Sequence, residues 1–99
     1  MLDKLQATDF QPHLNEIFHI RLDETLSIDL ELVSVTELGA SARVGERGPF
    51  SLHFLGPVST QYLQQHTYHL ENEKMGAFDF FIVPMGAEAG RMRYEAIFA

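Results

Sequence analysis

Five histidines among 99 residues are the first side chains to suggest chemistry, because imidazole binds metals and exchanges protons near neutral pH. The densest group is the segment His66-Thr-Tyr-His69-Leu-Glu71, which holds three potential metal ligands. Residues three apart on a strand point to opposite faces, so His66 and His69 would not converge on one ion. His69 and Glu71 share a face, but two ligands do not make a site. We therefore predict no bound metal and no other cofactor.

Hydroxyl and carboxylate side chains also lack a catalytic pattern. Ser41 and Ser59 lie in segments of ordinary loop composition, without the strained Gly-x-Ser-x-Gly turn that presents a nucleophile. Asp29 and Glu31 alternate outward on an expected strand, where carboxylates most often serve solubility. The glycines of Gly39 to Gly48 precede neither a helix nor a Lys-Ser/Thr pair, so they do not indicate a phosphate-binding loop. We predict that the protein is not an enzyme.

The charge balance argues against nucleic acid or a membrane as a partner. Fourteen acidic against seven basic side chains give a formal net charge of -7, the wrong sign for binding phosphate groups. Arg91 and Arg93 share the outward face of the last expected strand with Glu95, and a surface charge ladder explains them better than an anion site. No apolar run approaches the roughly 18 residues of a membrane span.

Stability has to come from packing, because the chain has no cysteine and therefore no disulfide or thiolate site. Hydrophobic residues make up 45% of the chain, which is enough for one core. We expect a single domain over residues 1–99, since this length leaves no room for a second one. The segment Met1 to Gln6 lacks the basic and apolar regions of a secretory signal, so we expect a cytoplasmic location.

Apolar and polar residues alternate along most of the chain after residue 15, which predicts strands and an all-β domain. Before this region, Leu2 to Asn15 predicts a short helical segment interrupted by Pro12. The six expected strands are Ile17 to Leu22, Thr25 to Leu38, Phe50 to Leu55, Thr67 to Glu71, Ala77 to Val83 and Arg91 to Phe98. The expected connections are a two-residue turn at Asp23-Glu24, a mobile loop over Gly39 to Gly48, a covering loop over Pro57 to His66, a hairpin loop over Asn72 to Gly76, and a loop over Pro84 to Gly90.

The second expected strand changes phase within its length. Leu30 and Leu32 continue one apolar face, whereas Val33 and Val35 fall on the other face. Such a change predicts a bulge or a sharp bend. A long bent strand is typical of a small barrel wall or of a strand shared by two sheets. We therefore predict a six-stranded antiparallel barrel or curved sandwich, two folds that periodicity does not separate.

The fifth expected strand is apolar on both faces, which is unusual for an antiparallel strand with one face in water. Either the N-terminal segment covers the second face, or that face meets another protein. The residues of a possible interface are Phe81 and Val83, joined by Leu55 and Ile97 from the same outward phase. The opposite phase should belong to one core, to which we assign Phe78, Phe80, Tyr94 and Phe98.

Several segments together resemble a family of short, uncharacterised bacterial single-domain proteins, and the resemblance covers nearly the whole chain. The resemblance implies a compact β domain of unassigned function. Its association with phage-tail-like collar proteins would imply a role in particle assembly. Family members commonly have glycine where this chain has His66, which disfavours a left-handed backbone at this position. The segments that carry the resemblance are Leu5-x3-Asp9-Phe10 with Phe18, Pro49 to Pro57, Thr67 to Glu71, Phe81 to Pro84 and Met92 to Ala96.

These observations favour a non-enzymatic protein-interaction or assembly module, which the resemblance would make an accessory of a phage-tail-like particle. Its partner would be another protein or a second copy of the chain, as in a homodimer. The alternative is a small-molecule-binding β-barrel whose mouth is formed by the loops Gly39 to Gly48 and Pro84 to Gly90. An enclosed cavity would favour the alternative, and a filled core would favour the interaction module.

Overall fold

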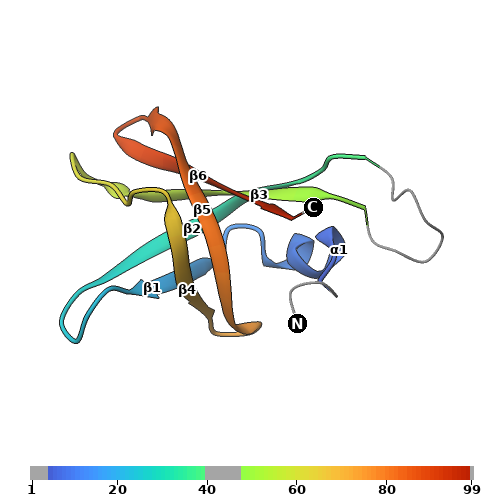
Figure 1. Cartoon of the computed structure of the whole chain (residues 1–99), viewed down its shortest axis with the longest axis horizontal. Coiled ribbons are helices and arrows are strands. Elements are labelled where there is room, and N and C mark those ends of the chain that lie inside the picture. The colour runs from blue at the N-terminus through green and yellow to red at the C-terminus, as the bar shows by residue number, and fades with distance from the viewer. Residues whose placement is uncertain (1–4, 40–47, 99) are drawn as a thin grey trace.

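The computed structural model describes residues 5–39 and 48–98 and shows a closed six-stranded antiparallel β-barrel (Figure 1). Of the two predicted folds, the barrel is therefore the right one. Around the wall the strand order is β1-β2-β3-β6-β5-β4. The strands are β1 (Ile17–Arg21), β2 (Ser27–Glu37), β3 (Phe50–Val58), β4 (His66–Asn72), β5 (Gly76–Glu88) and β6 (Arg91–Phe98).

The expected N-terminal helical segment is present as α1 (Ala7–Phe10) followed by the 3-10 helix η2 (Gln11–His13). Gln6 is the N-cap residue that precedes α1, and its backbone N–H donates to Asp9 Oδ2 at 2.7 Å. The α1 helix lies at one end of the barrel, close to the C-terminal end of β6 (Figure 1). Its Phe10 side chain is fully buried and joins the barrel core. The helical segment therefore closes this end of the barrel.

The inward phases predicted for the strands are confirmed in the middle of each strand, where alternate side chains are buried. At the β1–β2 connection, alternation puts Leu22 in phase with Phe18 and Ile20, and Leu26 in phase with Leu30 and Leu32, yet Leu22 and Leu26 are exposed. The reason is a longer turn than the predicted Asp23-Glu24 pair, because Asp23 Oδ1 accepts hydrogen bonds from the backbone N–H groups of Thr25 and Leu26. The core residues of the strands include Phe18, Ile20, Leu30, Leu32, Phe50, Leu52, Phe54, Leu70, Phe80, Ile82, Tyr94, Ala96 and Phe98.

The predicted phase change in β2 is confirmed as a register shift between Leu32 and Ser34 in the pairing with β3. The first part of β2 pairs with β1, and the part beyond residue 30 pairs with β3. The bulge thus lies near the corner where β2 passes from one neighbour to the other. Of the predicted loop Gly39 to Gly48, residues 40–47 lie outside the described residues.

Two predicted strand ends are wrong. Strand β3 runs through the expected Gly56-Pro57 stop to Val58, and β5 continues through the expected loop from Pro84 to Glu88. Proline removes one N–H group and glycine favours positive φ, so both residue types indicated loops. In the structure they are absorbed in register shifts, between Leu55 and Val58 and between Pro84 and Gly86, where φ of Gly86 is 122°.

From residue 5 onward, the N-terminal segment does not cover the outward face of β5, so the expectation of such a cover is wrong for the described residues. The Phe10 ring packs on the inward phase, with its centroid 6.0 Å from that of Phe80 and 6.1 Å from that of Phe78. Phe81 on the opposite face is 52% exposed. The described part of the chain therefore leaves this face of β5 open.

Among the described helical residues, no helix is long and apolar enough to cross a membrane.

Candidate functional site

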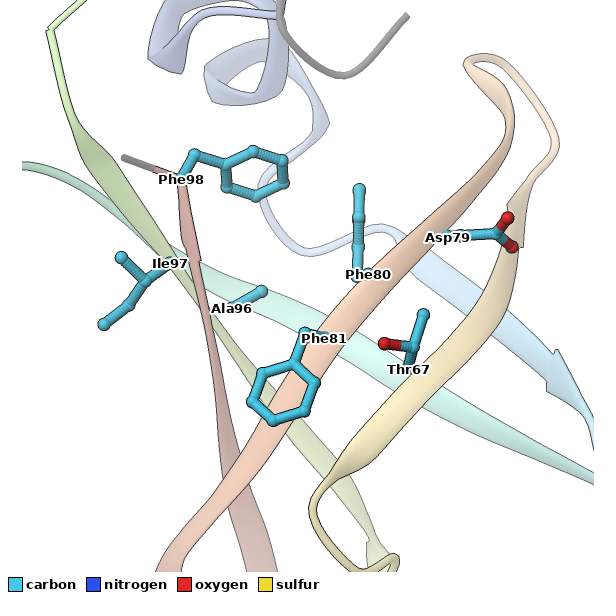
Figure 2. Close-up of a pocket in the computed structure, with 7 residues that line it drawn as sticks. All are labelled: Thr67, Asp79, Phe80, Phe81, Ala96, Ile97 and Phe98. Atoms are coloured by element: carbon cyan, nitrogen blue, oxygen red, sulfur yellow. The ribbon is translucent and has the colours of Figure 1, made fainter.

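The wall of the barrel opens between β5 and β6 at the end closed by α1. The two strands pair from Glu88↔Arg91 as far as Val83↔Glu95, with the register shift between Pro84 and Gly86 inside this stretch. Beyond that pair, β5 continues in register with β4 only, and β6 continues with β3 only. Figure 2 shows the two strands diverging toward the helical end, with a space between them. The barrel is thus closed by full pairing at one end of this seam and open at the other.

A surface cavity of about 390 Å³ lies in this opening (Figure 2). Its lining combines inward side chains, such as Phe80, with outward ones, such as Phe81. Residues from the two faces of one continuous sheet cannot line a single cavity, so the cavity lies in the seam itself. We call it the β5–β6 groove, and its lining is Thr67, Asp79, Phe80, Phe81, Ala96, Ile97 and Phe98.

The floor of the β5–β6 groove is aromatic. If the β5–β6 pairing continued beyond Val83↔Glu95, Phe80 would be the register partner of Phe98. The two residues are not paired, but their ring centroids lie 5.2 Å apart in an edge-to-face arrangement. The Phe10 ring packs against both, with centroid separations of 6.0 Å to each. Three bulky rings therefore meet where the two strands part. We attribute the opening of the wall to this packing, which makes the barrel wider at the helical end.

The rim of the groove contains two of the four residues predicted for an interface. Phe81 is 52% exposed and Ile97 is 60% exposed, and both line the same groove. Val83 is half-buried at the closed end of the groove, where it pairs with Glu95. Leu55 is half-buried on β3 opposite Arg93 and does not contribute to the described lining. The structure thus brings Phe81 and Ile97 together and leaves Leu55 apart from them.

The polar residues of the groove come from β4 and β5 and were not predicted. Thr67 is the register partner of Phe81, a pairing that the predicted Asn72 to Gly76 hairpin loop could have supplied. The Asp79 carboxylate is 68% exposed, and its Oδ1 lies 2.9 Å from His69 Nδ1. Because His69 carries a charge only when protonated, no permanent cation pairs with Asp79 in the part of the chain that the structure describes. The groove is therefore apolar with one acidic edge.

Outside the groove, histidines and carboxylates alternate across the outward faces of neighbouring strands. His19 Nδ1 on β1 lies 2.6 Å from Asp29 Oδ1 on β2, and His19 is also the register partner of Glu71 on β4. His69 Nε2 lies 3.7 Å from Glu71 Oε2. The outward phases were predicted, but the strand order that aligns them was not. Within residues 5–39 and 48–98, no group of three or more such side chains is arranged to hold a metal ion.

The predicted separation of His66 from His69 is confirmed by their register. His66 pairs with Ile82 and shares the phase of Tyr68, whose ring centroid lies 5.3 Å from that of His66. His69 is in the opposite phase, beside Asp79. His66 has an extended backbone and does not adopt positive φ.

The two arginines of β6 are engaged in contacts within the barrel. Arg91 donates from Nε to the Gly56 carbonyl at 2.7 Å and from Nη2 to Glu31 Oε1 at 3.1 Å. Arg93 donates from Nη1 to Glu88 at 3.2 Å and from Nε to His53 Nδ1 at 3.0 Å. Both guanidinium groups therefore have partners on other strands, whereas Glu95, which the predicted ladder sets beside them, contacts His53.

Among the described residues, the groups with shifted pKa values lie outside the groove. Burial raises the pKa of the Tyr94 hydroxyl, which accepts a 2.8 Å hydrogen bond from the Leu63 N–H. The hydrogen bond from His13 is the main cause that lowers the pKa of the Glu16 carboxyl. Backbone hydrogen bonds, first that of Thr25, lower the pKa of Asp23. Each shift has a local structural cause, and none of these three groups lines the groove.

Residues 5–98 match the family described as Domain of unknown function (DUF6916). The chain belongs to this family. No curated protein and no solved structure matches the chain. The predicted resemblance to an uncharacterised domain family is therefore confirmed, whereas nothing in these comparisons supports an association of DUF6916 with phage-tail-like collar proteins.

Proposed function

We propose that this DUF6916 domain is a non-enzymatic protein-interaction module that binds its partner in the β5–β6 groove. The observation that carries the proposal is the open seam, at which Phe81 and Ile97 are half or more exposed beside an aromatic floor. Apolar side chains gathered at a surface opening favour burial against another molecule. The same opening interrupts strand pairing, and unpaired strand edges bind other chains readily.

Packing elsewhere in the barrel supports binding in preference to catalysis. The largest side chains of the interior are almost completely buried, and their rings are in direct contact. His19, His53 and Arg91 of the outward faces are paired with carboxylates or a carbonyl group. Among the described lining residues, Thr67 and Asp79 alone contribute polar side chains to the groove. Asp79 contacts His69, which lies outside the described lining, so within that lining neither the hydroxyl nor the carboxylate has a base or acid beside it, and this favours recognition over bond cleavage.

A small-molecule ligand is the second candidate, because cavities of about 300 to 1,000 Å³ commonly hold such ligands and the groove has a volume of about 390 Å³. Its place differs from the mouth expected at the Gly39 to Gly48 and Pro84 to Gly90 loops. The expected Pro84 to Gly90 loop is largely part of strand β5, so this part of the expected mouth is wrong. Residues 40–47 of the first lie outside the described residues.

Site-specific photo-cross-linking tests the proposed function. A benzophenone amino acid replaces Phe81 in the full chain, produced in the cells that naturally contain the protein. We expect a discrete protein adduct, identified by mass spectrometry. The matched control places the same group at Val58, an exposed apolar residue of β3 that pairs with Arg91 at the opposite end of β6, where we expect no such adduct. No protein adduct at Phe81, or equal adducts at both positions, would contradict the proposal, and a non-protein adduct at Phe81 alone would favour the second candidate.

A further inference from the structure

We propose that the β5–β6 groove binds an extended segment of a second protein as an added β-strand, and that this segment alternates aliphatic with basic side chains. The inference rests on the proposed interaction function and names the chemistry of the partner. It depends on three features of the groove, which are its backbone edges, its two rows of side chains and its charge.

The backbone edges come from the loss of β5–β6 pairing. From Gly76 to Ile82, β5 has register partners on β4 alone, and Ala96 and Ile97 of β6 have register partners on β3 alone. In a strand, hydrogen-bonding groups point alternately to its two sides. Some N–H and C=O groups along this part of β5 therefore face the seam without a ladder partner from β6. An extended peptide can satisfy such groups by strand addition.

The geometry of the seam limits the segment that can fit. The open part of β6 is short and ends near Phe98, whereas the open part of β5 reaches back to Gly76. A guest strand would therefore contact both strands over a few residues and continue along β5 alone. Since β5 and β6 are antiparallel, the guest would be antiparallel to one and parallel to the other.

The side-chain rows of the groove define the pattern of the guest. Its inward residues would meet the Phe80 and Phe98 rings, which favours aliphatic side chains. Its outward residues would pass between Phe81 and Ile97 and reach the edge that carries Asp79. A lysine or arginine fits this second row, because its methylene stem packs on apolar surface while its charge stays in water. The alternation of a strand then requires aliphatic and basic residues in turn.

The charge of the groove and of the chain selects a basic partner. Asp79 has no arginine or lysine partner among the described residues, and the whole chain carries a net charge of -7. Opposite charge steers association and favours binding of the correct partner. A second copy of this acidic chain is the less suitable occupant, because its own charge opposes the approach.

A blocked Lys-Val-Lys-Val-Lys-Val peptide, titrated into the full chain labelled with ¹⁵N, tests the inference. We expect saturable shifts of the amide signals of Asp79 to Ile82 and of Ala96 and Ile97, together with slower hydrogen exchange at those amides. N-methylation of the valines removes backbone donors and should weaken binding about tenfold or more. A peptide with glutamate in place of lysine should not bind. Equal binding of the N-methylated peptide, or shifts confined to other strands, would overturn strand addition.

Two matched variants separate the charge contribution from general effects. Asp79→Asn should weaken binding of the lysine peptide severalfold. Asp29→Asn is the control, because Asp29 is also an exposed carboxylate in contact with a histidine but lies on β2, away from the groove. Equal loss in both variants, or no loss in Asp79→Asn, would overturn the basic preference. A cross-linked partner at Phe81 combined with no peptide binding would reject strand addition and leave the interaction function standing.

Discussion

At the scale of single residues, the Tyr94 hydroxyl holds the segment between β3 and β4 against the barrel. It accepts a hydrogen bond from the Leu63 N–H, and both residues are buried. Tyr94→Phe would leave this N–H without its partner, so we expect a loss of about 1 to 3 kcal/mol in the free energy of unfolding. Urea denaturation measures the loss. Tyr68→Phe is the control, since its hydroxyl donates to the Gln64 carbonyl at an exposed site and should matter much less. Equal stability of Tyr94→Phe and the parent would contradict this role.

Asp23 makes the β1–β2 turn sensitive to acid. Its carboxylate accepts hydrogen bonds from the backbone of Thr25 and Leu26, and the Thr25 bond is the main cause of its lowered pKa. A carboxyl with a lower pKa in the folded state stabilises the fold above its unfolded pKa of about 3.9, and this stabilisation is lost as the pH falls through the folded value. We expect Asp23→Ala to be less stable than the parent at pH 7, and the difference to shrink on acidification below about pH 4. A difference that stays constant with pH would contradict this account.

At the scale of elements, adjacent residues of strand β5 point to opposite faces, one toward the core and one toward the proposed binding groove. Phe80 is 2% exposed and contacts Phe10 and Phe98, whereas Phe81 is on the open rim. Phe80→Ala should cost about 3 to 5 kcal/mol, a large part of the stability of a small domain. Phe81→Ala is the matched control and should change stability little. Thermal melting of both variants tests the assignment, and a Phe80→Ala melting point within a degree or two of the parent would show that the faces are wrongly assigned.

The elements also show how far the sequence predicts this structure. Alternation predicted the six strands, the bulge after Leu32 and the inward phases, because burial of one face imposes a period of two. It did not predict the course of β5 beyond Pro84, because a bulge and a loop have the same glycine and proline signals.

Of the candidate site, Phe81 and Ile97 were predicted as outward apolar residues, but the opening between β5 and β6 was not. We attribute that opening to packing of Phe10 against Phe80 and Phe98, three residues far apart in the sequence. The histidines and carboxylates of the outward faces likewise lie beside one another because of the strand order, which was not predicted. Contacts of this kind follow from the closed topology, and alternation within a single strand contains no information about them.

At the scale of the whole molecule, the groove and the net charge have opposing effects on self-association. The exposed Phe81 and Ile97 favour burial against a second copy, whereas a charge of -7 on each chain repels it. Salt screens the repulsion and leaves the apolar attraction largely intact. We therefore expect a monomer of 11.3 kDa at low salt and a rising average mass at moderate salt, when no basic partner is present. Light scattering coupled to size exclusion measures both masses.

Phe81→Lys identifies the surface that would cause this association. The lysine replaces an exposed apolar side chain at the groove rim, so the variant should stay monomeric at both salt concentrations and keep a stability near that of the parent. A closed dimer is the favoured product for the parent chain, because a self-complementary patch on a two-fold axis prevents open-ended growth. An average mass that is independent of salt would contradict the prediction. Association that persists in Phe81→Lys would place the contact on another face of the barrel.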